Sequence, residues 1–138
     1  MMKTKKVCPV VLRKKAEEIE ILAFQHPTAG FQIVKGTIEI GEDTEIAALR
    51  ELAEESGIIS ISKCEFKGFS DSIVENQTWY FYNCHVNELL KDNWEFFANE
   101  DGGMNFSFFW FNLNEPPTEN WHPTFHIVLQ YIRENFDL

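Results

Sequence analysis

One segment of the chain, residues 36–58, constrains the fold more than any other because glycines and charged residues recur in it at a fixed spacing. Gly36 is followed after five residues by Glu42, and seven residues later by the run Arg-Glu-Leu-x-Glu-Glu-x-Gly-Ile at 50–58. Each of the seven fixed glycine and charged residues is of a type that makes up about 5–7% of average proteins, so a match at a given start has a probability on the order of 10⁻⁸. The spacing therefore points to a specific structure or chemistry.

Three glutamates of this segment are predicted to share one side of a helix. On a helix from about 43 to 56, Glu51, Glu54 and Glu55 are neighbours, because residues three and four positions apart lie on the same side. Like charges at these spacings destabilise a helix, so the cluster favours a bound cation. A second side carries the apolar residues that are expected to face the core: Ile46, Leu49 and Ala53.

Clustered carboxylates indicate a hard divalent cation. Mg²⁺ and Mn²⁺ prefer oxygen ligands, keep several waters and share their coordination with substrate phosphates. Such a metal polarises a phosphoryl oxygen and activates water. The alternative is a solvated acidic helix face, and the spacing of the whole segment decides against it.

The segment resembles, at every defined position, the signature of the Nudix hydrolases. The resemblance implies an α/β (α+β) fold, a Nudix-like α/β/α sandwich with a central mixed sheet, in a single domain over residues 1–138 with its box at 36–58. It implies hydrolysis of a pyrophosphate bond in a nucleoside diphosphate linked to another moiety, with Mg²⁺ as the cofactor and Mn²⁺ as a substitute. Ile40 stands where many members have proline, and nothing chemical depends on that difference.

The resemblance also assigns metal ligands. Glu54 and Glu55 match the principal metal-ligand positions, and Gly36 matches a loop glycine whose carbonyl completes the metal shell. Glu51 matches a position that ligates a metal or serves as general base in different members.

Three further residues are expected around the metal. Glu42 and Arg50 match a pair that braces the loop against the helix, and a structural role is preferred for both. Lys35 directly precedes the box and is a candidate contact to a substrate phosphate, with a solvent-facing lysine as the alternative.

The sequence leaves two candidates for the general base, Glu51 and a later acidic loop. Some members of the family use a residue in a later loop, and here that loop contains Glu100 and Asp101, followed by two glycines that favour a tight or mobile turn. The expected catalytic set is Glu51, Glu54 and Glu100. An ordinary acidic turn is the alternative for the Glu100 loop.

Composition limits the partners. The net charge of −10 repels polyanions, so duplex nucleic acid is not expected, while a divalent cation would allow a small phosphorylated nucleotide derivative. Three cysteines without a CxxC spacing predict a reducing, cytoplasmic location. No stretch approaches the ~18 apolar residues of a membrane span, so no membrane partner is expected. Many members of the family dimerise, which makes a homodimer a further hypothesis.

Hydrophobic periodicity predicts strands, a helix, more strands and a last helix, an order typical of a mixed sheet covered by helices on both faces. The helix in the box is expected to begin at Asp43 or Thr44 and to end at Gly57. Pro123 fits the first turn of the last helix, to about 135. The predicted strands are 7–13, 18–25, 31–34, 61–69, 78–86 and 105–113.

Two questions stay open at this level. The first is whether the chain is a non-catalytic Nudix-fold module that senses a nucleotide, and the intact glutamate set argues against it. The second is which aromatic rings stack on a base, because rings at strand spacing more often belong to the core. The candidates for stacking are Trp79, Tyr80, Phe109, Trp110 and Trp121. His122 and His126 do not form a zinc-protease motif, because Pro123 occupies the glutamate position.

Overall fold

A computed structural model describes residues 3–99 and 102–138 of the chain. The strands are β1 (Thr4–Val10), β2 (Leu12–Lys15), β3 (Glu18–His26), β4 (Gly30–Gln32), β5 (Gly36–Thr37), β6 (Ile61–Ser70), β7 (Gln77–Val86), β8 (Trp94–Ala98) and β9 (Met104–Asn112). The helices are α1 (Thr44–Ser56) and α2 (Pro123–Asn135). Neither helix is long and apolar enough to cross a membrane.

The strands form two sheets. The first has the order β5-β1-β7-β6, and its central pair, β1 and β7, is parallel from Thr4 opposite Gln77 to Val10 opposite Asn83. The second has the order β2-β3-β9-β8, with β4 paired to β3, and all of its pairs are antiparallel. The expected mixed α/β fold is confirmed, with the strands divided between two sheets.

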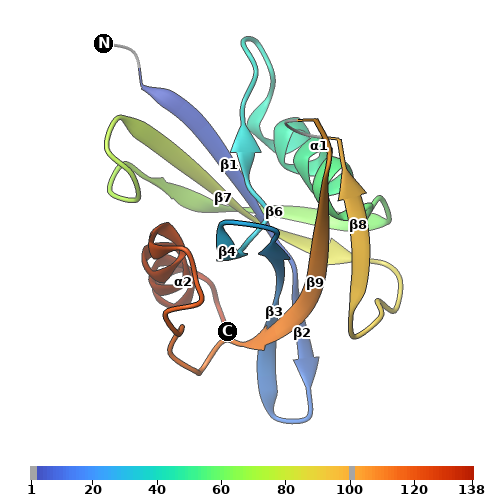
Figure 1. Cartoon of the computed structure of the whole chain (residues 1–138). Coiled ribbons are helices and arrows are strands. Elements are labelled where there is room, and N and C mark those ends of the chain that lie inside the picture. Colours follow the sequence, from blue (N-terminus) through green and yellow to red (C-terminus); the bar gives the residue numbers. More distant parts are fainter. Residues whose placement is uncertain (1–2, 100–101) are drawn as a thin grey trace.

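The two helices lie on opposite sides of the sheet that contains β1 and β7 (Figure 1). Along β7, Trp79 and Phe81 belong to the core cluster that includes α2, while Tyr82 and Cys84 belong to the cluster that includes α1. This alternation follows from the two-residue period of a strand. The sheet therefore separates two apolar clusters, and its edge near α1 and β5 positions the box.

Most elements lie where periodicity predicts them. The strands β3, β6, β7 and β9 match their predicted ranges to within one residue at each end, and α2 begins at Pro123. The predicted strand 7–13 is divided into β1 and β2, which pair with different neighbours. The short strand β5 and the edge strand β8 were not predicted, because two residues carry no periodicity and β8 is only partly buried.

Helix α1 has the predicted ends and a different buried face. Asp43 caps it by accepting a hydrogen bond from the Glu45 amide at 2.8 Å, and Gly57 ends it with φ 80°. The expected apolar anchor is wrong, since Ile46 is 59% exposed. The face that is buried consists of Ala47, Ala48, Glu51, Leu52, Glu55 and Ser56. Small alanines allow close packing against β1, and that approach turns two glutamates toward the sheet.

Candidate active site

A hollow of about 500 Å³ lies where α1 faces β1 and the segment around β5. We call it the carboxylate hollow, and its lining residues are Lys6, Lys35, Gly36, Thr37, Glu39, Arg50, Glu51 and Glu55. It brings together both ends of the box, because Gly36 begins β5 while the glutamates come from the third turn of α1 onward. Acidic and basic side chains therefore face one solvent-filled space.

Gly36 is required at its position by the close approach of Glu51. A Cβ atom built on Gly36 would lie 1.9 Å from Glu51 Cδ and 2.2 Å from both carboxylate oxygens. Glu51 and Glu55 are only 5% and 4% exposed. The missing side chain thus leaves room for a buried carboxylate beside the backbone of β5.

Arg50 ties the loop to the helix. Its Nε and Nη2 donate to the two carboxylate oxygens of Glu42, at 2.7 and 2.9 Å. Its Nη1 donates to Glu51 Oε1 at 2.9 Å and to Glu54 Oε2 at 3.2 Å. Nη2 also donates to the Thr37 carbonyl at 3.1 Å. One guanidinium thus holds three carboxylates and the β5 backbone.

These contacts shift the pKa values of Glu42 and Arg50. The hydrogen bonds from Arg50, helped by the Glu39 amide, lower the pKa of Glu42 to about 2. The same contacts raise the pKa of Arg50 further above its ordinary value. Both groups therefore stay charged across the neutral range, as a bidentate ion pair requires.

The donors of the hollow fit a hard cation in their chemistry. Glu51, Glu55 and the Gly36 carbonyl offer oxygen only, which is what Mg²⁺ prefers. Glu54 lies apart, with its side chain 52% exposed, and lines a different hollow together with Phe97. Among residues 3–99 and 102–138, no three metal-ligating side chains are already gathered at metal-binding distance. The carboxylates of Glu51 and Glu54 instead form salt bridges with Arg50.

Several residues expected from the sequence are now placed. Lys35 lines the carboxylate hollow. Glu100 and Asp101, the alternative general bases, lie outside the described residues. Sequence reasoning missed Lys6, whose Nζ donates to Thr37 Oγ1 at 2.7 Å. Lys6 pairs with Thr37 across β1 and β5, a contact that no local sequence signal marks.

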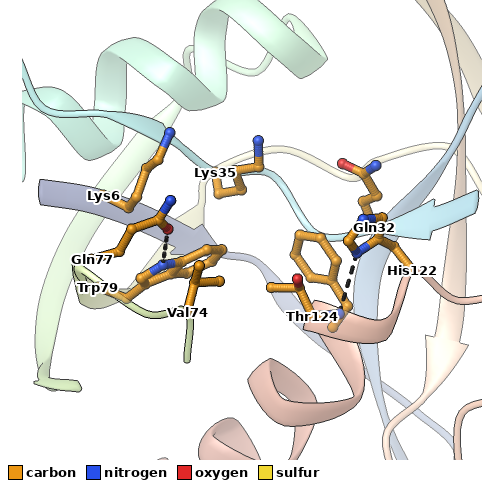
Figure 2. Close-up of a pocket in the computed structure, with 9 residues that line it drawn as sticks. Lys6, Gln32, Lys35, Val74, Gln77, Trp79, His122 and Thr124 are labelled. Atoms are coloured by element: carbon orange, nitrogen blue, oxygen red, sulfur yellow. Dashed lines mark hydrogen bonds between the residues drawn. The ribbon is translucent and has the colours of Figure 1, made fainter. Parts of the chain in front are cut away.

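A second pocket of about 250 Å³ adjoins the hollow and shares Lys6 and Lys35 with it. We call it the cationic pocket, and Figure 2 shows its side chains. Its lining residues are Lys6, Gln32, Lys35, Val74, Gln77, Trp79, His122, Thr124 and Phe125. Of the aromatic rings considered for stacking, Trp79 and Trp121 are buried at 2% exposure, and Trp110 is covered by the Arg13 guanidinium at 4.2 Å.

The family model of the NUDIX domain matches residues 2–131. The chain belongs to this family. The expected membership of the Nudix family is thereby confirmed, and the fold is shared with solved MutT structures. No curated protein matches the sequence.

Solved structures share the fold at low sequence identity. The MutT NUDIX hydrolase of Burkholderia pseudomallei is 18% identical over 96% of this chain and 99% of that chain, with a TM-score of 0.67. The NUDIX domain of Shewanella oneidensis NrtR, complexed with ADP ribose, is 15% identical over 97% and 88%, with a TM-score of 0.66. The Ap4A hydrolase of C. elegans is 20% identical over 95% and 96%, with a TM-score of 0.61.

Proposed function

We propose that this Nudix protein hydrolyses a pyrophosphate bond in a nucleoside diphosphate linked to another group, with Mg²⁺ or Mn²⁺ as the metal. The observation that carries the proposal is the approach of the Glu51 carboxylate to Gly36, where a Cβ would lie 1.9 Å from Glu51 Cδ. A buried carboxylate held against a side-chain-free backbone segment, beside two lysines, suits a metal-bridged diphosphate.

Several residues in and beside the hollow have a part in this reaction. Glu51, Glu55 and the Gly36 carbonyl would hold the metal, with Glu54 joining them, and the bound metal would supply charge neutralisation at the phosphoryl oxygens. Arg50 keeps Glu51 and Glu42 in place through its hydrogen bonds. The reaction forms a bond from the water oxygen to phosphorus and breaks the bond from that phosphorus to the bridging oxygen.

The proton of the attacking water needs an acceptor. We assign this role to Glu51 or to Glu100, as the sequence suggests. Glu51 lies in the carboxylate hollow with one oxygen already accepting from Arg50. Glu100→Gln separates the two: a loss of kcat with the affinity for the metal kept would identify Glu100 as the base, and an unchanged kcat would leave the role to Glu51, whose replacement also removes a metal ligand.

Glutamine replacement of the metal ligands is the main test. In Glu54→Gln and Glu55→Gln we expect turnover to fall by roughly a thousandfold, because the neutral amide is a weaker ligand for Mg²⁺. Released phosphate and pyrophosphate are measured over a panel of nucleoside diphosphate derivatives. Glu45→Gln is the matched control, since Glu45 is exposed on the first turn of the same helix.

Full turnover in either glutamine variant would overturn the assignment of the metal ligands. Tight nucleotide binding by the unaltered protein, with no product after long incubation with Mg²⁺ or Mn²⁺, would instead identify a sensing module. Circular dichroism of each variant shows whether the fold is kept.

A further inference from the structure

The cationic pocket has a chemistry that the carboxylate hollow does not share. We propose that it binds a further phosphate group of the substrate, beyond the diphosphate that is cleaved, in preference to a stacked nucleobase. This inference rests on the proposed function, since it names the group attached to the diphosphate.

The charge of the pocket lining is the first argument. The protein has 22 acidic residues and a net charge of −10, yet among residues 3–99 and 102–138 none of those that line the pocket is acidic. Two of them, Lys6 and Lys35, carry ammonium groups. Within residues 3–99 and 102–138, Lys35 makes no hydrogen bond or salt bridge. A local positive region in an acidic molecule attracts anions and raises their local concentration.

The side-chain amide of Gln77 is oriented as a donor. Gln77 Oε1 accepts a hydrogen bond from Trp79 Nε1 at 2.8 Å, so the Gln77 amide nitrogen is directed away from the indole. Figure 2 shows this nitrogen on the same side as the tips of Lys6 and Lys35. Three nitrogen donors thus face one space, as recognition of phosphate oxygens requires.

The start of α2 adds another donor. His122 Nδ1 accepts from the Thr124 amide at 3.2 Å and caps the helix. In the neutral ring the proton then resides on Nε2, which makes that nitrogen a donor. The pocket also contains Gln32, which is only 8% exposed and whose side-chain amide donates a hydrogen bond to the Ala29 carbonyl at 3.3 Å. Its amide oxygen can accept from a hydroxyl of the same ligand.

The aromatic residues of the pocket do not offer a stacking face. Trp79 and Phe125 are each 2% exposed, and their rings pack edge to face with 6.2 Å between the ring centroids. A base needs an exposed ring on which to stack. The volume of about 250 Å³ suits a compact group such as one or two phosphates or a phosphorylated sugar.

The position of the lysines links the two spaces. Lys6 and Lys35 line both the carboxylate hollow and the cationic pocket, so one extended ligand can occupy both. With the cleaved diphosphate beside Glu51 and Glu55, the next group along the substrate lies over Trp79. A third phosphate there would meet the ammonium groups rather than the carboxylates.

Binding to the protein without metal tests the pocket directly. Isothermal titration calorimetry in EDTA would use two probes, inorganic tripolyphosphate and ribose 5-phosphate. We expect at least one to bind, and Lys35→Gln to weaken that binding by roughly tenfold because one charge-assisted contact is lost. Lys14→Gln, which removes an exposed charge on β2, should leave the binding unchanged. The tighter probe distinguishes a polyphosphate chain from a phosphorylated sugar.

Turnover supplies the second readout. Diadenosine tetraphosphate should have a higher kcat/KM than diadenosine diphosphate, and Lys35→Gln should reduce this preference mainly through KM. Equal probe binding by the unaltered protein and Lys35→Gln, or no binding of either probe, would overturn the inference. Absence of all turnover, with probe binding still sensitive to Lys35→Gln, would refute the proposed hydrolysis and leave the anion pocket standing.

Discussion

A side chain at position 36 would enter the space that the Glu51 carboxylate occupies. In Gly36→Ala the new Cβ would lie 1.9 Å from Glu51 Cδ, and Glu51 is long enough to move away. We therefore expect the carboxylate to be displaced, with turnover falling by about a hundredfold or more while the protein stays folded. Steady-state kinetics with Mg²⁺ and the melting temperature together check this.

Gly41→Ala is the contrasting variant. Gly41 has φ 78° and nothing within 4 Å of its built Cβ, so alanine there strains the backbone without touching Glu51. It should cost about 1 kcal/mol of stability and keep most of the turnover. If Gly36→Ala behaved like Gly41→Ala, with stability lost and activity kept, the link between Gly36 and Glu51 would be refuted.

The pKa of Glu42 gives the Glu42–Arg50 pair a defined pH dependence. Its pKa is lowered from an ordinary 4.5 to about 2, so the ionised form is favoured by folding. The stabilisation is complete above about pH 4.5 and is lost as the pH falls toward 2. Urea midpoints of the unaltered protein and of Glu42→Gln should differ by a constant amount above pH 5 and converge below pH 4. A difference that grew on acidification would contradict this.

Helix α1 shows both the strength and the limit of reading a sequence. Its ends are predictable because the Asp43 cap and Gly57 act locally. Its buried face is not, because periodicity fits Ile46, Leu49 and Ala53 as well as the alanine face that packs on β1. Hydrophobicity then favours the wrong side, since a core-facing glutamate is uncommon outside a functional site.

The cationic pocket is the part of the site that sequence reasoning could not assemble. Its residues come from β1, β4, β7 and α2, which are far apart along the chain. Gln77 and Gln32 carry no motif, and their meeting depends on the parallel pairing of β1 with β7 and the pairing of β4 with β3. The box is recognisable because its chemistry lies within one short segment.

The contribution of the Asp43 N-cap to the stability of α1 can be tested by substitution. In Asp43→Ala the Glu45 amide loses its acceptor at 2.8 Å, and we expect a loss of about 1 kcal/mol in unfolding free energy. Asp43→Asn keeps an acceptor and should cost much less. Chemical denaturation of the three proteins checks the order. Equal stability of all three would show that the cap contributes nothing to α1.

The sheet of β5, β1, β7 and β6 is shared by two apolar clusters. One cluster contains α2, the other contains α1, and alternate residues of β1 and β7 enter each. The same arrangement lets Lys6 of β1 line both the cationic pocket and the carboxylate hollow beside α1. Stability and the position of the site therefore depend on one common sheet.

This sharing predicts that the chain unfolds as a single unit. Leu52 on α1 and Leu129 on α2 are both fully buried, one in each cluster. Leu52→Ala and Leu129→Ala should each cost about 2–5 kcal/mol and shift the same transition, because neither cluster persists without the sheet. Urea unfolding followed by tryptophan fluorescence and by far-ultraviolet circular dichroism should give coincident curves for both variants. Two separated transitions, with only one moved by each substitution, would show that the clusters fold independently and that the single-domain prediction is wrong.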